Sequence, residues 1–117
     1  MGLELFRDTM KTREPLIIYI AGPMRGHEDD NYPAFYEAEE MLKSKGIWLP
    51  INPARMDEEL VKYGDIVEVD YKLALKRDID EIFEADAMYM LKGWEKSEGA
   101  RVEHALAIYL GLSIMYQ

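Results

Sequence analysis

The stretch Leu16–Ala21 (LIIYIA) is a continuous apolar run that is rich in β-branched residues. A run of this kind, without alternating polar residues, is typical of a strand that is buried on both faces, as in a parallel sheet. The run ends at Gly22–Gly26 (GPMRG), where two glycines and a proline favour a tight loop. Because a parallel strand reaches its neighbour only through a crossover, this stretch predicts an α/β fold built from β-α-β units.

The remainder of the chain alternates between helical and strand patterns. The elements expected after the first strand are a helix over 31–46, a strand over 47–51, a helix over 71–85, a strand over 87–91, a helix over 97–111 and a strand over 113–116. Asn31 and Ser97 are expected to cap their helices, and Pro50 favours an edge position for the second strand. This order predicts a small doubly wound, Rossmann- or flavodoxin-like three-layer sandwich, whose short parallel sheet has about four strands in the order 2-1-3-4.

The segment over 56–70 is acidic and is interrupted by Gly64. We expect a helical turn over 58–63 and then a loop, which is either a lid or a plain connection. Residues 1–14 are expected to form an N-terminal extension that lies outside the α/β pattern. Residues 15–117 are then expected to form a single domain.

Composition argues against several classes of function. The net charge of −9 is opposite to what a general electrostatic grip on nucleic acid requires, so no nucleic-acid partner is expected. No apolar run approaches the roughly 20 residues that span a bilayer, so we expect no membrane partner. With no cysteine and only two histidines, a disulfide framework is excluded, and no metal or organic cofactor is expected. The absence of cysteine and of a signal-peptide pattern favours the cytoplasm.

The stretch Ser97–Ala107 is the strongest candidate for a working site. This stretch comes after a predicted strand and a turn-like connection, and it begins a predicted helix. Glu103 lies in the early turns of that helix. Ala100 and Ala107 lie three and four residues from Glu103 on the same helix face, so little side-chain bulk shields its carboxylate. Open α/β sheets bind ligands at the carboxyl ends of their strands, where this stretch begins. A solvated glutamate on the helix surface is the alternative.

Three further positions point toward the same crevice, over the first and third strands. The glycine pattern after the first strand fits a structural turn as well as a ligand loop. Arg25 in that loop favours a ligand, because its guanidinium suits a phosphate or a carboxylate. Asn52 follows the second strand, again at its carboxyl end. Asp78 intrudes on the edge of the apolar stripe of the helix over 71–85, so it is either paired with a neighbour such as Arg77 or functional.

Four motifs, taken in their order along the chain, carry a resemblance to a known family. They are Tyr19–Gly26, Arg77-Asp78-Ile79, Ala85-Asp86 and Ser97-x-Gly99-x-x-x-Glu103. With this order and spacing, the chain resembles the nucleoside 2-deoxyribosyltransferase superfamily, which includes the 2′-deoxynucleoside 5′-monophosphate N-glycosidases. The resemblance covers roughly residues 16–115.

The resemblance implies a role for several residues. Glu103 would be a nucleophile, Asp78 the acid that assists the departing base, and Tyr19 a group that orients Glu103 or the sugar. The candidate substrate-binding residues are Gly22, Pro23, Arg25, Gly26, Asn52, Ser97, Gly99 and Arg101. Many family members have a small residue, often Gly, where this chain has Arg101, and members that bind phosphate can have a Ser hydroxyl in place of Pro23. These two departures leave the identity of the substrate open.

The resulting hypothesis is a hydrolase that cleaves the N-glycosidic bond of a (deoxy)nucleoside 5′-monophosphate through a glycosyl-enzyme intermediate. The alternatives are a nucleoside 2-deoxyribosyltransferase that exchanges bases, and a non-catalytic nucleotide-binding or sensor module on the same scaffold. A Ser-His-Asp hydrolase is disfavoured because His104 adjoins Glu103 and so faces another way. A homodimer or a larger homo-oligomer is expected. The aromatic residues expected to be exposed for that purpose are Trp48, Trp94, Tyr109 and Tyr116.

Overall fold

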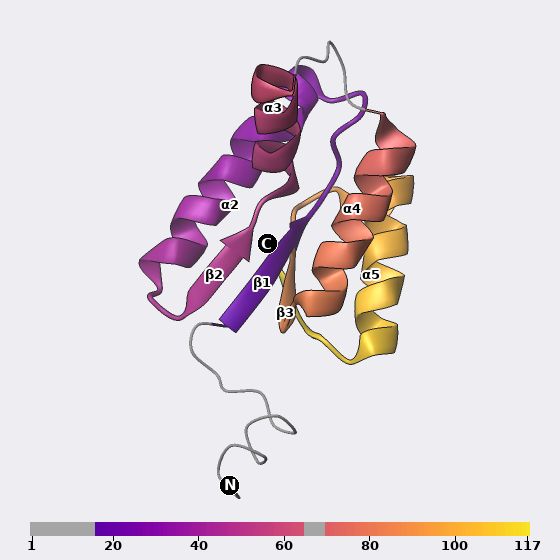
Figure 1. Ribbon diagram of the computed structural model, residues 1–117. Coiled ribbons are helices and arrows are strands. Elements are labelled where there is room, and N and C mark those ends of the chain that lie inside the picture. Colours follow the sequence, from indigo (N-terminus) through magenta and orange to yellow (C-terminus); the bar gives the residue numbers. More distant parts are fainter. Residues whose placement is uncertain (1–15, 65–69) are drawn as a thin grey trace, which may run out of the picture.

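The computed structural model describes residues 16–64 and 70–117. The expected N-terminal extension over 1–14, and residues 65–69 of the acidic connection, lie outside the described residues. The elements are β1 (Leu16–Ala21), η1 (Glu28–Asn31), α2 (Tyr32–Ser44), β2 (Trp48–Ile51), α3 (Pro53–Tyr63), α4 (Tyr71–Glu84), β3 (Ala87–Met90), η2 (Trp94–Lys96), α5 (Glu98–Leu110) and β4 (Ser113–Tyr116) (Figure 1).

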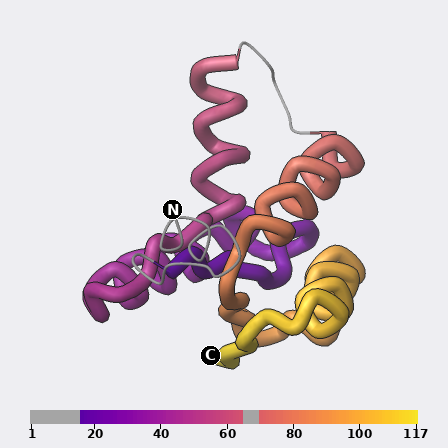
Figure 2. Tube along the Cα trace, turned by 60° about the horizontal axis from the view of Figure 1, so that its bottom comes forward, coloured from indigo at the N-terminus to yellow at the C-terminus, as the bar shows by residue number. Residues whose placement is uncertain are grey.

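The four strands form one parallel sheet in the order β2-β1-β3-β4, which confirms the predicted topology. β1 lies in the centre, where Tyr19 pairs with Ile51 on one side and with Met88 on the other. Helices α2 and α3 lie on one side of the sheet and α4 and α5 on the other (Figure 1). Figure 2 shows the same division from a second direction. The molecule is therefore a small three-layer α/β sandwich.

Two apolar cores lie on the two faces of the sheet, and β1 contributes to both. Ile18 and Ile20 pack with Phe35 and Leu42 of α2. The alternate residues of β1 pack on the other face with α4, α5 and β3, in a cluster that contains Tyr19, Ala21, Ile82, Ala85, Met88, Met90 and Ala107. Because successive side chains of a strand point to opposite faces, a strand buried on both faces reads as an unbroken apolar run.

Helix α3 corrects one prediction. The chain was expected to be irregular after residue 56, with a helical turn over 58–63, but α3 is continuous from Pro53 to Tyr63. Asn52 is its N-cap, because the side-chain oxygen of Asn52 accepts hydrogen bonds from the backbone N–H groups of Ala54 and Arg55, at 2.9 and 3.3 Å. An Asn cap followed by Pro at the first helical position is a regular helix start.

Asn31 corrects a second prediction. It occupies the N-cap position of α2, but its backbone is left-handed, with φ at 61°, and its side chain makes no capping hydrogen bond. The side-chain amide donates instead to the backbone carbonyl of Pro23, at 2.8 Å. Asn31 therefore ties the start of α2 to the loop after β1. Ser97, by contrast, caps α5 as predicted, because its hydroxyl oxygen accepts from the N–H of Ala100.

The aromatic residues expected at the surface divide into two pairs. Tyr109 and Tyr116 are exposed, by 87% and 56%. Trp48 and Trp94 are half-buried and pack against the two cores, so for them the expectation of an exposed ring is wrong. Within residues 16–64 and 70–117, no helix is both long and apolar enough to cross a membrane.

Candidate active site

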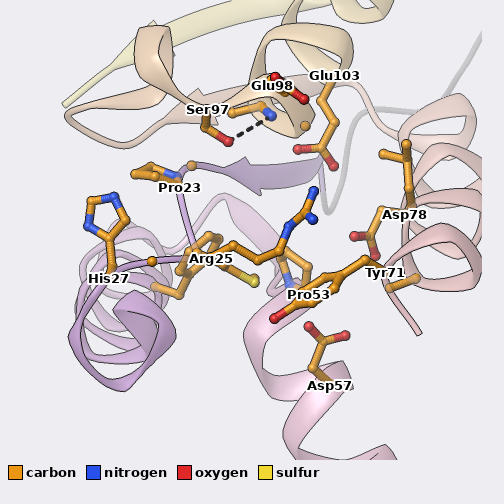
Figure 3. Close-up of a pocket in the computed structure, with 18 of the residues that line it drawn as sticks. Pro23, Arg25, His27, Pro53, Asp57, Tyr71, Asp78, Ser97, Glu98 and Glu103 are labelled. Carbon is orange, nitrogen blue, oxygen red and sulfur yellow. Dashed lines mark hydrogen bonds between the residues drawn. The ribbon is translucent and has the colours of Figure 1, made fainter. Parts of the chain in front are cut away.

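A cavity of about 530 Å³ opens where β1, β2 and β3 end (Figure 3). Its walls come from the loop after β1, the first turns of α3, the inner face of α4, and the loop and first turns of α5. The structure brings together here most of the residues predicted from the sequence. These are Tyr19, Gly22, Pro23, Arg25, Gly26, Asp78, Ser97, Gly99 and Glu103.

Glu103 is buried in the wall formed by α5, with only 6% of its surface exposed. The neighbours on its helix face, Ala100 and Ala107, are buried too, so this face of α5 packs inward and Glu103 is not a solvated surface glutamate. Burial raises the pKa of Glu103 to about 8, although a hydrogen bond from Tyr19 lowers it and the charge of Asp78 raises it further. A carboxyl group that favours its protonated form near neutral pH is a candidate for catalysis.

Tyr19 lies beneath Glu103 in the centre of β1 and is completely buried. Its hydroxyl donates a hydrogen bond of 2.5 Å to Oε2 of Glu103. Burial, and then the nearby Glu103, raise the pKa of Tyr19 well above its usual value, so the phenol remains a neutral donor. The nearby hydroxyl of Tyr19 also lowers the pKa of Asp78. Tyr19 thus holds Glu103 and acts electrostatically on Asp78.

Asp78 lies on α4, across the cavity from Glu103 (Figure 3). Two nitrogen atoms of Arg77, Nε and Nη2, donate to its Oδ1 at 2.9 and 2.6 Å. Burial raises the pKa of Asp78 to about 6, while the charge of Arg77 and its hydrogen bonds lower it. Asp78 is therefore both paired with Arg77 and part of the cavity wall, so the two interpretations made from the sequence are compatible.

The cavity wall also carries positive charge and open backbone. Its cationic side chains are Arg25 and Lys96, and the hydroxyl of Ser97 and the first turn of α5 line it too. A Cβ atom at Gly99 would meet no described atom within 4 Å, so this turn leaves room for a ligand to approach its backbone N–H groups. The guanidinium of Arg25 lies 4.5 Å above the ring of Tyr71, at the start of α4.

The two loop glycines are required for different reasons. A Cβ atom at Gly22 would lie only 2.7 Å from the Cβ of Leu91, so this position needs glycine for close packing between the ends of β1 and β3. Gly26 has a φ of +82°, a conformation that side chains other than glycine rarely adopt. Together they fix the path of the loop that presents Arg25 to the cavity.

Two predicted substrate-binding residues are not among those that line the cavity. Asn52 is buried, its oxygen caps α3, and its amide nitrogen donates to Oε1 of Glu39 at 3.1 Å. Its hydrogen-bonding groups are therefore used within the fold. Arg101 is exposed on α5 and lies outside the cavity wall. The helical periodicity explains this position, because a residue two places before Glu103 points about 200° away around the helix.

Asp57, Tyr71 and Lys96 are among the cavity residues that were not predicted from the sequence. The sequence contained a signal for Asp57, because a helix that begins at Pro53 places residue 57 one turn later, on the same face as Pro53. Tyr71 and Lys96 carry no comparable signal, since the direction in which the start of α4 and the end of η2 face depends on the tertiary fold.

The two histidines do not form a catalytic pair with Glu103. His104 stacks on Trp94 with ring centroids 4.1 Å apart, and one of its ring nitrogens, Nε2, lies 2.8 Å from the hydroxyl of Tyr116. It therefore faces away from Glu103, as predicted. His27 lies on the cavity wall beside the loop after β1. In the part of the chain that the structure describes, no group of three or more His, Cys, Asp or Glu side chains is arranged to hold a metal ion.

A family model described as a domain of unknown function (DUF4406) matches residues 16–116, so the chain belongs to this family. The matched range includes every described element and all of the cavity residues. No curated protein matches the chain at a significant level of sequence similarity. The description of the family states no activity, and the chemistry of the cavity is the basis for assigning one.

Proposed function

We propose that this member of the DUF4406 family hydrolyses the N-glycosidic bond of a (deoxy)nucleoside 5′-monophosphate, with Glu103 as the nucleophile and Asp78 as the acid. One observation carries the proposal: two buried carboxyl groups with raised pKa values face one cavity, and Tyr19 donates a hydrogen bond to one of them, Glu103. Cleavage of a glycosidic bond needs two such groups in different roles, because one must stabilise or attack C1′ while the other protonates the leaving group.

In the first step, an ionised oxygen of Glu103 forms a bond to C1′ of the sugar as the bond from C1′ to the base nitrogen breaks. Asp78 donates its proton to that nitrogen, so the base leaves as a neutral molecule. The products of this step are the free base, an ester between the sugar and Glu103, and the ionised carboxylate of Asp78. The hydroxyl of Tyr19 holds the carboxyl group of Glu103 in place throughout.

In the second step, a water molecule attacks C1′ while the carboxylate of Asp78 removes one of its protons. The bond between C1′ and Glu103 breaks, which releases the sugar 5-phosphate and restores the ionised nucleophile. Asp78 is protonated again, as it was at the start. If a second base takes the place of water, the same ester leads to base exchange.

The ligand-free site holds its proton on Glu103, whose pKa is about 8, more firmly than on Asp78, whose pKa is about 6. The reaction needs the opposite distribution. Positive charge that develops on the sugar lies next to Glu103 and favours its ionised form. Because both carboxyl groups face the same cavity, the proton that Glu103 releases is taken up by Asp78 within the site.

The cationic side chains of the cavity support a phosphorylated substrate. Arg25 and Lys96 supply two positive charges, and the hydroxyl of Ser97 and the backbone beside Gly99 supply neutral donors. Glu98 lines the same cavity and offsets part of this positive charge. Against an overall charge of −9, these cations and donors give a phosphate local partners.

A panel of nucleosides and their 5′-monophosphates tests the proposal. Each compound is incubated with the protein, and free base and sugar phosphate are quantified by chromatography. Equal amounts of the two products are expected from the monophosphates. In a parallel reaction with a second free base, a new nucleotide would identify a transferase instead of a hydrolase. Absence of base release from every compound would contradict both.

A further inference from the structure

Asp57 is a buried acid that the proposed reaction does not use. It lies on α3 in the cavity wall, and only 5% of its surface is exposed (Figure 3). Burying a carboxylate is costly unless a cation or aligned donors compensate it. Burial raises the pKa of Asp57, and Arg77 only partly offsets that effect. The burial of Asp57 in the cavity wall therefore suggests a role for its charge.

The guanidinium of Arg77 is shared between two carboxyl groups. Its Nη2 atom lies 2.6 Å from Oδ1 of Asp78 and 2.7 Å from Oδ1 of Asp57. Nε and Nη2 both donate hydrogen bonds to Asp78. Oδ1 of Asp57, by contrast, has no donor in hydrogen-bond geometry among the described residues. Arg77 thus directs its hydrogen bonds to Asp78, while its charge is divided between the two acids.

The charges that face Asp78 come from four elements. Arg77 lies beside it on α4 and favours its ionised form, as does the nearby hydroxyl of Tyr19 on β1. Asp57 on α3 opposes them, because a second negative charge favours the protonated form of Asp78. Glu103 on α5 is the remaining acid, and it interacts electrostatically with Asp78. Asp57 therefore opposes the effect of Arg77 on the protonation of Asp78.

Arg25 is a further cation of the same cavity. Its guanidinium reaches over Tyr71 into the cavity, between Glu103 and Asp78 (Figure 3). Arg25 is exposed and has no acidic partner among the described ion pairs, whereas Arg77 is anchored by two. Arg77 and Asp57 are therefore the ion pair held in place beside Asp78.

We propose that Asp57 and Arg77 form a positioning pair that keeps Asp78 able to hold a proton and pass it to the leaving base. Arg77 fixes the orientation of the Asp78 carboxyl group through two hydrogen bonds. The negative charge of Asp57 offsets part of the effect of Arg77, which by itself favours the ionised form of Asp78. The role in proton transfer rests on the proposed function. The effect on Asp78 itself does not, and it can be measured in the absence of any substrate.

The test is a carboxyl-carbon NMR titration of Asp78 in the full chain. The resonance is identified by its loss in Asp78→Asn. In Asp57→Asn, the pKa of Asp78 is expected to fall below about 6, by roughly one unit, which is the size of effect that one nearby charge has. The matched control is Glu58→Gln, which removes a negative charge from the adjacent, exposed position of α3, where Glu58 bonds to Tyr36 outside the cavity. The control should leave the titration of Asp78 unchanged.

Arg77→Lys provides a second, opposite test. Lysine retains the charge but lacks the two-nitrogen contact, so the pKa of Asp78 is expected to rise. If the pKa of Asp78 is unchanged in either variant, the positioning role is wrong, and the ion pair is only a tie between α3 and α4. Thermal melting shows that each variant is folded before it is titrated.

Kinetics separates this inference from the proposed function. If the wild-type protein releases base, Asp57→Asn should lower kcat with little change in KM, because the protonated form of Asp78 becomes rarer while the binding groups are intact. If base is released but the pKa of Asp78 does not shift in the variants, only the positioning role of Asp57 and Arg77 is contradicted. If the pKa of Asp78 shifts as expected but no substrate releases base, the positioning role of Asp57 and Arg77 is supported and the proposed glycosidase activity is contradicted.

Discussion

The burial of Glu103 lowers the free energy of unfolding at neutral and higher pH. Glu103 is an acid with 6% of its surface exposed, and burial raises its pKa from 4.5 to about 8. The folded protein therefore retains a proton that the unfolded chain releases above pH 4.5. In this situation stability falls as pH rises from about 4.5 to about 8, since ionisation becomes increasingly favourable in the unfolded state.

The stability of Glu103→Gln tests this account. Glutamine has the same shape, still accepts a hydrogen bond from Tyr19, and has no charge to bury. The variant should be more stable than the wild type at pH 8, by on the order of 3–4 kcal/mol, and nearly equal to it at pH 5. Urea unfolding at the two pH values measures the difference. A constant difference between them would show that Glu103 does not titrate with a raised pKa.

Arg25 is expected to decide between phosphorylated and unphosphorylated substrates. Arg25→Gln should reduce kcat/KM for a 5′-monophosphate by about 10- to 100-fold, the range for loss of a charge-assisted hydrogen bond. The corresponding nucleoside should be affected by less than about twofold. Arg101→Gln is the matched control, because Arg101 is exposed and lies outside the cavity wall. An equal loss of kcat/KM with the nucleoside and with its 5′-monophosphate would show that Arg25 does not bind the phosphate.

At the scale of elements, Asn52 links β2 to α3. Its side-chain oxygen caps α3 and its amide nitrogen contacts Glu39 of α2. Asn52→Ala should therefore lower the free energy of unfolding by about 1–2 kcal/mol, as is usual for loss of an N-cap. KM should change by less than about twofold. A large rise in KM with unchanged stability would restore the substrate-binding role that the sequence suggested. Asp70→Ala, at the exposed N-cap of α4, is a control for loss of a cap alone.

Elements with strong local patterns were predicted well. The unbroken run of β1 and the helix with Gly111 at its end match the structure, because hydrophobic periodicity and capping are local properties. The start of α3 was missed even though Asn52 and Pro53 signal it, since its charged, weakly apolar sequence obscured the helical period. Because the start of α3 was missed, Asp57 was not placed on a helix face that lines the cavity.

The candidate site was predictable as far as it depends on topology. Parallel strands bring the loops after β1 and β3 together, so the Gly22–Gly26 loop and Glu103 could be placed at one crevice from the order of elements, whereas the role of Tyr19 came from the family resemblance. The sharing of Arg77 between Asp57 and Asp78 could not be predicted, because it depends on how α3 and α4 face each other across the cavity. No sequence spacing encodes such a contact.

At the scale of the whole molecule, an exposed apolar face on α5 favours self-association. Val102 and Tyr109 lie seven residues apart on one face of the helix, exposed by 48% and 87%. Tyr109→Lys should lower the molar mass measured by light scattering toward that of one chain. Tyr63→Lys is the control, because Tyr63 is 74% exposed on α3, on the other side of the sheet. A wild-type protein that is monomeric at all concentrations would contradict the expected homo-oligomer.

The rate of base release by Glu103→Gln at pH 7 tests the central claim most directly. This pH lies between the pKa values of about 6 and about 8 that belong to Asp78 and Glu103. Calorimetry should show that the variant still binds the best 5′-monophosphate from the substrate panel. Its rate of base release should fall by roughly a thousandfold or more, because glutamine cannot form the glycosyl ester. Base release at the wild-type rate by a variant that binds normally would contradict the account and remove Glu103 from the mechanism.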